Sequence, residues 1–130
     1  MTEKQLHKSI CDYIKLQYPN VLFNTDMSGI KLTIGQATQA KKLRSDKGFP
    51  DIVIYAFHIS DKTNYVCKVY SALFLEVKKE TPFKKDGKLK KSDHLSEQLD
   101  MQNKLNALGY KAEFVWSFDM AKDIIDNYLK

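Results

Sequence analysis

Cysteine is scarce in this sequence: the 130 residues include two, Cys11 and Cys67. Two thiols cannot build the disulfide framework of a small secreted protein, and their spacing fits no zinc site, so both are expected to be reduced. Apolar runs are too short to span a bilayer. Residues 1–10, MTEKQLHKSI, lack the apolar stretch of a secretory signal. These absences predict a soluble, cytoplasmic protein with no membrane partner.

Internal repeats, low-complexity segments and linkers are also lacking, so residues 1–130 are expected to form one domain. A hydrophobic fraction of 43% and a charged fraction of 28% are usual for a globular chain that buries a real core. The net charge is +5, which favours a polyanionic partner. Where the lysines lie therefore matters more than how many there are.

Hydrophobic spacing and capping residues predict the elements. Thr2 and Gln5 form a capping-box pattern ahead of apolar residues at helical spacing, and Pro19 ends that run. Two strands on either side of SDKTN (60–64) should pair as an antiparallel hairpin. The expected helices cover 2–18, the segment capped by Ser96 and ended by Gly109, and 119–129. The expected strands cover 21–24, 51–58, 66–79 and 111–118. Residues 35–48 are expected to form a basic helix or an ordered loop. The order α-β-β-β-α-β-α predicts an α/β fold with helices packed on a sheet.

Two acids should meet at the open end of this hairpin. The turn at 48–50 delivers Asp51 to the start of one strand, and Glu76 interrupts the apolar end of the other. Opposed residues in a hairpin have numbers that average to the turn, and 51 and 76 average to a position inside SDKTN. Because side chains alternate along a strand, Lys78 should share a face with Glu76.

Neighbouring carboxylates repel each other unless a cation lies between them. Mg²⁺ takes few carboxylate oxygens and completes its octahedron with water and phosphate, so Asp51, Glu76 and a backbone carbonyl would suffice. Such an ion could activate water against a phosphodiester. The alternative is a solvated ion pair, because Glu-x-Lys on a strand is common. The apolar run SALFLEV around Glu76 favours the metal site, since an unmatched buried charge is costly.

Four stretches, GFPD, FLEVKK, HLSEQ and LNALGYKAEFVWSFDMAKDIIDNYL, resemble the VRR-NUC family of PD-(D/E)XK nucleases. The resemblance covers nearly the whole chain. It implies a restriction-endonuclease-like core in which helices flank a mixed central β-sheet. It also implies that Asp51, Glu76 and the Val77 carbonyl bind the metal and that Lys78 lies beside the attacking water.

Two further positions take roles from the resemblance. Gln98 matches a glutamine in the first turn of the helix after the catalytic strand, and Glu3 matches an acid of the family's first helix. The alternatives are a solvated glutamine and an acid that favours the helix dipole. The polar insert HISDKTNYVCK makes the hairpin longer than the family pattern, so its tip is expected to be extended or irregular.

A lysine-rich loop, KKETPFKKDGKLKKSDH, separates the second hairpin strand from the next helix. As single residues its lysines could equally form a solvated face. As a group they flank the acids, and lysines bind phosphates as point charges without reading sequence. The expected DNA-binding residues are Lys79, Lys84, Lys85, Lys88, Lys90 and Lys91, with Lys41, Lys42 and Arg44 as the other wall of the site.

The histidines and large aromatic residues are expected to be structural. The histidines show no metal-ligand spacing, and the aromatics fall on predicted strands, where they usually fill the core. The histidines are His7, His58 and His94, and the aromatic residues include Tyr55, Phe57 and Trp116.

Together these patterns predict a Mg²⁺- or Mn²⁺-dependent DNA endonuclease. A short chain without a targeting domain favours a structure-selective enzyme, and the family analogy implies a homodimer acting on branched DNA such as a Holliday junction. Three alternatives remain: a non-catalytic nucleic-acid-binding module on the same fold, a flap or nicking nuclease acting as a monomer, and a protein-interaction subunit. Metal-dependent cleavage separates a nuclease from the binding module and from the interaction subunit.

Overall fold

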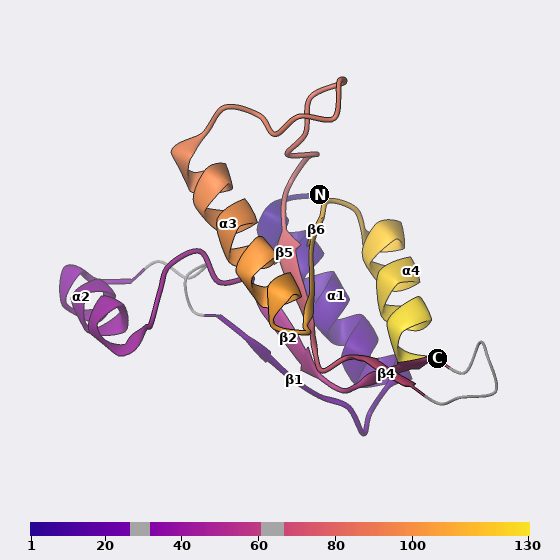
Figure 1. The fold of residues 1–130 in the computed structure, drawn as a ribbon. Coiled ribbons are helices and arrows are strands. Elements are labelled where there is room, and N and C mark those ends of the chain that lie inside the picture. Colours follow the sequence, from indigo (N-terminus) through magenta and orange to yellow (C-terminus); the bar gives the residue numbers. More distant parts are fainter. Residues whose placement is uncertain (27–31, 61–66) are drawn as a thin grey trace.

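A computed structural model describes residues 1–26, 32–60 and 67–130 of the protein (Figure 1). The described residues form four helices and six strands. In chain order these are α1 (Glu3–Gln17), β1 (Leu22–Thr25), α2 (Ile34–Leu43), β2 (Ile52–Tyr55), β3 (His58–Ser60), β4 (Cys67–Tyr70), β5 (Leu73–Val77), α3 (Asp93–Ala107), β6 (Lys111–Val115) and α4 (Phe118–Leu129). Among the described helices, none is long and apolar enough to cross a membrane.

The central sheet has four strands in the order β1-β2-β5-β6. β1 and β5 both pair antiparallel with β2, whereas β6 is parallel to β5, so the sheet is mixed as the resemblance implied. β2 and β5 pair Ile52 with Leu75, and this register sets Asp51 opposite Glu76. The antiparallel hairpin and its register, both predicted from the sequence, are therefore confirmed.

The hairpin strands are shorter than the sequence predicts, because each is divided in two. Beyond residues 56–57 and 71–72 the chain continues as β3 and β4, which form a separate two-stranded sheet with an irregularity between His58 and Ile59. Two backbone hydrogen bonds mark the breaks: Ala56 N–H donates to Ile54 at 3.1 Å, and Ser71 N–H donates to Gly109 at 2.9 Å. Residues 61–64 of the predicted SDKTN turn lie outside the described residues.

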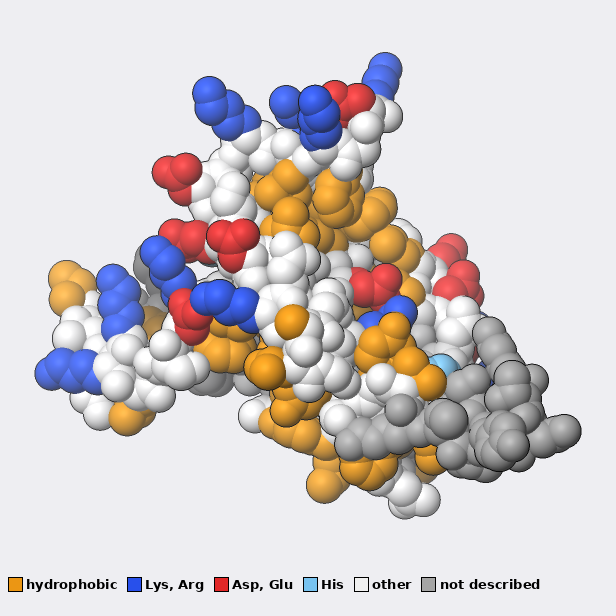
Figure 2. Space-filling model, in the orientation of Figure 1, with side chains coloured by type: hydrophobic (Ala, Val, Ile, Leu, Met, Phe, Trp, Pro, Cys, Tyr) orange, Lys and Arg blue, Asp and Glu red, His pale blue; other side chains and the backbone are white. Residues whose placement is uncertain are grey.

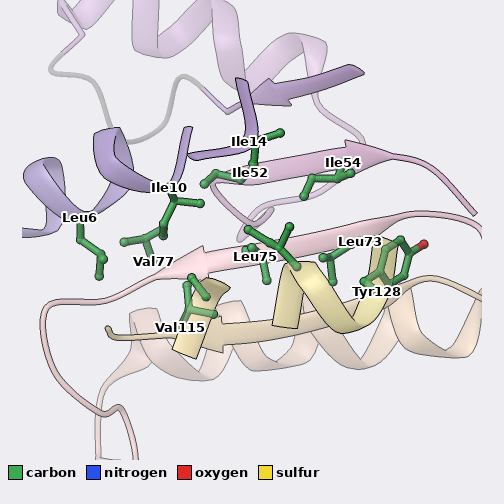
Figure 3. Close-up of a cluster of buried hydrophobic side chains, with 12 residues drawn as sticks. Leu6, Ile10, Ile14, Ile52, Ile54, Leu73, Leu75, Val77, Val115 and Tyr128 are labelled. Carbon is green, nitrogen blue, oxygen red and sulfur yellow. The ribbon is translucent and has the colours of Figure 1, made fainter. Parts of the chain in front are cut away.

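Helices cover both faces of the sheet. On one face, apolar residues of α1 and α4 pack on the inward residues of β2, β5 and β6 (Figure 3). These buried residues are Leu6, Ile10, Ile14, Ile52, Ile54, Leu73, Leu75, Val77, Val115, Ala121, Ile125 and Tyr128. On the other face, Met101 and Leu105 of α3 pack with Ala112 against Phe49 and Phe74. Glu76 lies between two residues that face the first core, so its side chain points to the α3 face.

α1 begins as the sequence predicts. The Thr2 hydroxyl accepts a hydrogen bond from the Gln5 N–H at 3.1 Å, and the Gln5 side-chain oxygen accepts one from the Thr2 N–H at 2.9 Å. This reciprocal cap satisfies two N–H groups that an uncapped helix would leave without partners. It fixes the first turn of α1, and therefore Glu3, beside the end of β5, where Lys79 contacts Glu3.

The predicted start of α3 is wrong by one turn. Ser92, not Ser96, is the N-cap, and its hydroxyl accepts a hydrogen bond from the Leu95 N–H at 3.3 Å. Gln98 therefore lies in the second helical turn instead of the first. Of the residues expected on the inner face of this helix, Leu105 is buried, Leu99 is half-buried, and Leu108, at the C-cap, is 73% exposed.

The basic segment before Gly48 contains a true helix, α2, which extends away from the body of the molecule in Figure 1. Every residue of α2 is exposed or half-buried. Three aromatic residues also differ from expectation: Tyr55 and Phe57 are more than half exposed, and Trp116 is half-buried. Tyr55 is the last residue of β2, Phe57 lies in the break between β2 and β3, and Trp116 follows β6.

Candidate active site and nucleic-acid interface

Asp51 is delivered to the sheet by a turn that favours glycine. Gly48 has a φ of +84°, and a Cβ there would lie 2.8 Å from the carbonyl oxygen of Glu97 on α3. At the end of this turn, the Asp51 carboxylate accepts a hydrogen bond from the Val77 N–H at 2.8 Å. The turn thus ties the start of β2 to both β5 and α3.

Glu76 is the most buried charged residue of the site, with 4% of its surface exposed. Its Oε1 accepts a hydrogen bond from Gln98 Nε2 at 2.7 Å and lies 3.7 Å from Lys78 Nζ. Its Oε2 is buried and accepts no hydrogen bond from a donor of the described residues, although the Asp51 carboxyl shares a hydrogen with Glu76 when one of the two acids is protonated. A buried carboxylate oxygen without a partner is costly unless a hydrogen or a cation reaches it.

The electrostatics of the acid pair favour protonation when no cation is bound. Burial, then the nearby Asp51 carboxylate, raise the pKa of Glu76 to about 9, although Lys78 opposes the shift. Burial also raises the pKa of Asp51, against the lowering effects of the Val77 N–H and of His7. Two adjacent carboxyl groups with raised pKa values are typical of a functional site.

Asp51 and Glu76 line a cleft with a volume of about 320 Å³. The other residues expected at the site line the same cleft. Glu3 reaches it from α1, where its Oε1 accepts a hydrogen bond from the Lys79 N–H at 3.3 Å. Val77 borders the cleft beside Asp51, and Gln98 closes it from α3. The structure therefore brings together all five residues expected from the resemblance to serve catalysis, Asp51, Glu76, Lys78, Gln98 and Glu3; their roles stay predictions.

The donor set fits a hard cation that takes few protein ligands. Within the described ranges, no group of three or more His, Cys, Asp or Glu side chains could hold a metal ion by itself. Asp51 and Glu76 would supply two carboxylates, and a Mg²⁺ ion normally takes its remaining ligands from water, a carbonyl and substrate phosphate. The unpaired Oε2 of Glu76 is the oxygen that such an ion would satisfy.

The lysine-rich loop is an ordered turn instead of a loose segment. Phe83 and Leu89 form an antiparallel bridge, and the Lys84 N–H donates to the Lys88 carbonyl at 2.7 Å. The Phe83 ring packs edge-to-face on Phe114 and Trp116 of the sheet. We call residues 82–90 the lysine hairpin. Figure 2 shows basic side chains gathered above an apolar area at the top of the molecule. The loop between β5 and α3 lies at the same place in Figure 1.

The individual basic residues differ in their surroundings. Lys79, Lys84, Lys85, Lys88 and Lys91 are exposed, and Lys90 is half-buried, 3.9 Å from Glu80. Lys41 and Lys42 are exposed on α2. Arg44 lines the cleft and contacts Asp26 at 3.3 Å, so this residue is partly neutralised.

Sequence reasoning missed several polar residues of the cleft, among them Asp26, Lys47, His94 and Glu97. Lys47 pairs with Glu97 at 2.8 Å, and His94 lies 3.1 Å from Gln98; both line the cleft. The spacing of four residues between His94 and Gln98 was the available signal, since such residues share one helix face. This spacing did not point to His94 because α3 was expected to begin after that residue.

Of the comparisons with known proteins, the one with solved structures gives the fold. No protein-family model matches the chain, and no curated protein matches it. Among solved structures, one described as a "VRR_NUC domain protein" superposes with a TM-score of 0.62 at 17% sequence identity. The alignment covers 99% of this chain and 88% of that one. The chain therefore has the fold of a VRR-NUC domain, a restriction-endonuclease-like α/β fold.

Proposed function

We propose that the protein is a divalent-metal-dependent nuclease that hydrolyses phosphodiester bonds in DNA. The observation that carries this proposal is the pair Asp51 and Glu76, opposed across the hairpin at a cleft, with an unpaired buried oxygen on Glu76 and Lys78 beside it. Glu113 Oε2 is also buried without a hydrogen bond, but it lies 3.6 Å from Lys111 Nζ, whereas Lys78 Nζ approaches the other oxygen of Glu76 at 3.7 Å. The fold supports the same assignment, because the solved protein that it resembles carries the VRR_NUC name.

The residues that were expected at the site have the following proposed roles. Asp51, Glu76 and the Val77 carbonyl would hold Mg²⁺ or Mn²⁺, which when bound lowers the pKa of water and offsets charge on phosphate. Lys78 is placed to orient the attacking water or to stabilise charge that develops on the phosphate oxygens. Gln98 holds the Glu76 carboxylate in place through its 2.7 Å hydrogen bond. Glu3 contributes negative charge at the cleft from α1.

The basic residues around the cleft support DNA as the substrate. Lys90 of the lysine hairpin lines a hollow together with Glu3, Lys78 and Lys79, so phosphates bound there would lie close to the acids. Lysine contacts to phosphate position a nucleic acid without reading its bases. We therefore propose a structure-selective enzyme that acts as a homodimer on branched DNA such as a Holliday junction.

Cleavage of defined DNA structures tests the proposal. The pure protein would be incubated with linear, flapped and four-way DNA in the presence of Mg²⁺, Mn²⁺ or a chelator. We expect metal-dependent cleavage by the wild type and none by Glu76→Gln. The amide has the shape of the carboxylate but lacks the negative charge that would hold the metal. Glu80→Gln is the matched control, because this glutamate is exposed and should leave cleavage unchanged. Undiminished cleavage by Glu76→Gln would show that the site assignment is wrong.

The main alternative is a nucleic-acid-binding module that keeps the fold without catalysis. A binder does not need two buried acids beside each other, and these acids weaken attraction to phosphate. It would bind DNA in the cleavage assay but leave it intact with every metal. A monomeric flap or nicking nuclease would instead cut one strand of the flapped substrate.

A further inference from the structure

His94 contacts the amide group that holds Glu76. It lies in the first turn of α3, one helical turn before Gln98. Its Nε2 lies 3.1 Å from Gln98 Nε2, and the same amide nitrogen donates to Glu76 Oε1 at 2.7 Å. The three side chains therefore form a chain of polar contacts from an exposed histidine to a buried acid.

The chemistry of the amide fixes the direction of these contacts. An amide nitrogen carries two hydrogens and accepts none, so a favourable contact at 3.1 Å requires an acceptor on His94. The His94 Nε2 is then unprotonated, and the ring hydrogen lies on Nδ1. One hydrogen of Gln98 points to Glu76, and the other points to His94.

The opposite orientation of the Gln98 amide would be repulsive while His94 is present as an acceptor. Glu76 Oε1 is an acceptor both when the acid is ionised and when its hydrogen lies on Oε2, so turning the amide by half a rotation would place the amide oxygen beside two acceptors, Glu76 Oε1 and His94 Nε2. In the part of the chain that the structure describes, no donor contacts the Gln98 oxygen, so that atom does nothing to fix the amide. Glu76 Oε1 and the acceptor on His94 therefore favour the same orientation, in which an N–H faces Glu76, and the contact with His94 adds to the preference.

We propose that His94 is a positioning residue: by accepting the second Gln98 hydrogen it orients the amide, and through the amide it holds the Glu76 carboxylate. The effect on metal binding and cleavage rests on the proposed function, whereas the contact itself does not. Residues behind a metal ligand typically change affinity or activity by about 10- to 100-fold. We expect an effect of that size when the acceptor is removed.

Two substitutions separate the acceptor from the bulk of the side chain. His94→Gln can place its amide oxygen near the present Nε2 and accept the same hydrogen, whereas His94→Leu fills space but accepts nothing. Mn²⁺ titration followed by electron paramagnetic resonance should show about 10- to 100-fold weaker binding for His94→Leu and recovery in His94→Gln. Asp93→Asn, on the adjacent exposed residue, is the control for the helix start and should bind like the wild type.

Nuclear magnetic resonance of the metal-free protein tests the contact independently of function. At a pH where imidazole is neutral, the two-bond ¹H–¹⁵N spectrum should show His94 with its hydrogen on Nδ1, and the Gln98 amide hydrogens should exchange slowly in the wild type and in His94→Gln but faster in His94→Leu. If His94 carries its hydrogen on Nε2, or if His94→Leu binds Mn²⁺ and exchanges like the wild type, the proposal is wrong. If these signatures are found but no variant binds metal or cleaves DNA, the positioning contact stands and the proposed nuclease function fails.

Discussion

The carboxyl group of Glu76 should make the stability of the metal-free protein depend on pH. Its pKa rises from an ordinary 4.5 to about 9 in the folded state. The folded protein therefore binds this proton more tightly than the unfolded chain does. The resulting stabilisation is complete below about pH 4.5, declines as the pH rises, and is lost above about pH 9. The raised pKa of Asp51 acts in the same direction.

We therefore predict that the melting temperature of the chelated wild type falls between about pH 5 and pH 9, and that Glu76→Gln reduces this fall. The amide cannot ionise, so the cost of a buried charge disappears. Differential scanning calorimetry at constant ionic strength measures the effect, with Glu80→Gln as the exposed control. Parallel curves for the wild type and Glu76→Gln would contradict the raised pKa of Glu76.

Gly48 shows at the scale of an element how the site is held to the fold. We predict that Gly48→Ala destabilises the protein by more than about 1 kcal/mol, since it adds both the cost of a positive φ and a clash with the Glu97 carbonyl on α3. Gly87→Ala in the lysine hairpin is the matched control, because Gly87 has a similar φ of +85° but open space around it. Urea unfolding should give a larger loss for Gly48→Ala; equal losses would mean that the contact with α3 is unimportant.

The lysine hairpin gives a prediction about binding. Neutralising the lysines of the hairpin and the adjacent Lys91 should weaken binding to all DNA sequences alike, because lysine contacts to phosphate carry no base information. The residues to be changed are Lys84, Lys85, Lys88, Lys90 and Lys91. Each lost contact should reduce the slope of log affinity against log salt by about 0.9 on duplex DNA. Phe83 remains to anchor the hairpin on Phe114 and Trp116, so the fold should be preserved.

Fluorescence anisotropy over a range of salt concentrations measures that slope. Neutralising Lys122 and Lys130 of the C-terminal segment is the matched control, since these lysines lie far in sequence from the cleft and instead contact Asp126. A loss restricted to certain sequences would indicate base readout by the hairpin, and an unchanged slope would remove the hairpin from the DNA interface.

Local sequence patterns predicted the elements that depend on local chemistry. The cap of α1 needs only Thr2 and Gln5, and the meeting of Asp51 with Glu76 needs only the register of one hairpin. The start of α3 was missed because Ser92 and Ser96 are both good caps, and the choice depends on tertiary burial. Starting at Ser92 places two polar residues, Gln98 and Gln102, on the buried face, which a search for apolar periodicity does not find.

At the scale of the whole molecule, the fold follows from the pattern more readily than the use of the surface does. Tyr55 and Phe57 lie in a run typical of a core strand, yet they are 56% and 59% exposed, because they alternate with Ile54 and Ala56, which pack in the core with α1 and α4, and so face the other way. Coverage is decided by where helices lie in space, not by strand propensity. The same limit applies to assembly, because no local pattern marks an interface between copies.

The homodimer proposed for branched DNA is therefore tested on the intact protein. A four-way junction offers two symmetric strands to cut, and a twofold dimer would present two copies of Asp51, Glu76 and Lys78 in related orientations. We predict that light scattering at micromolar concentration gives about twice the chain mass of 15.1 kDa. We also predict two cuts placed symmetrically about the branch, mapped by labelling each strand in turn. Mixing the wild type with excess Glu76→Gln should then yield junctions cut on one side only, since a mixed dimer has one active site. A protein that stays monomeric on bound junction DNA, or that cuts a single strand without the inactive variant present, would favour a flap or nicking nuclease instead.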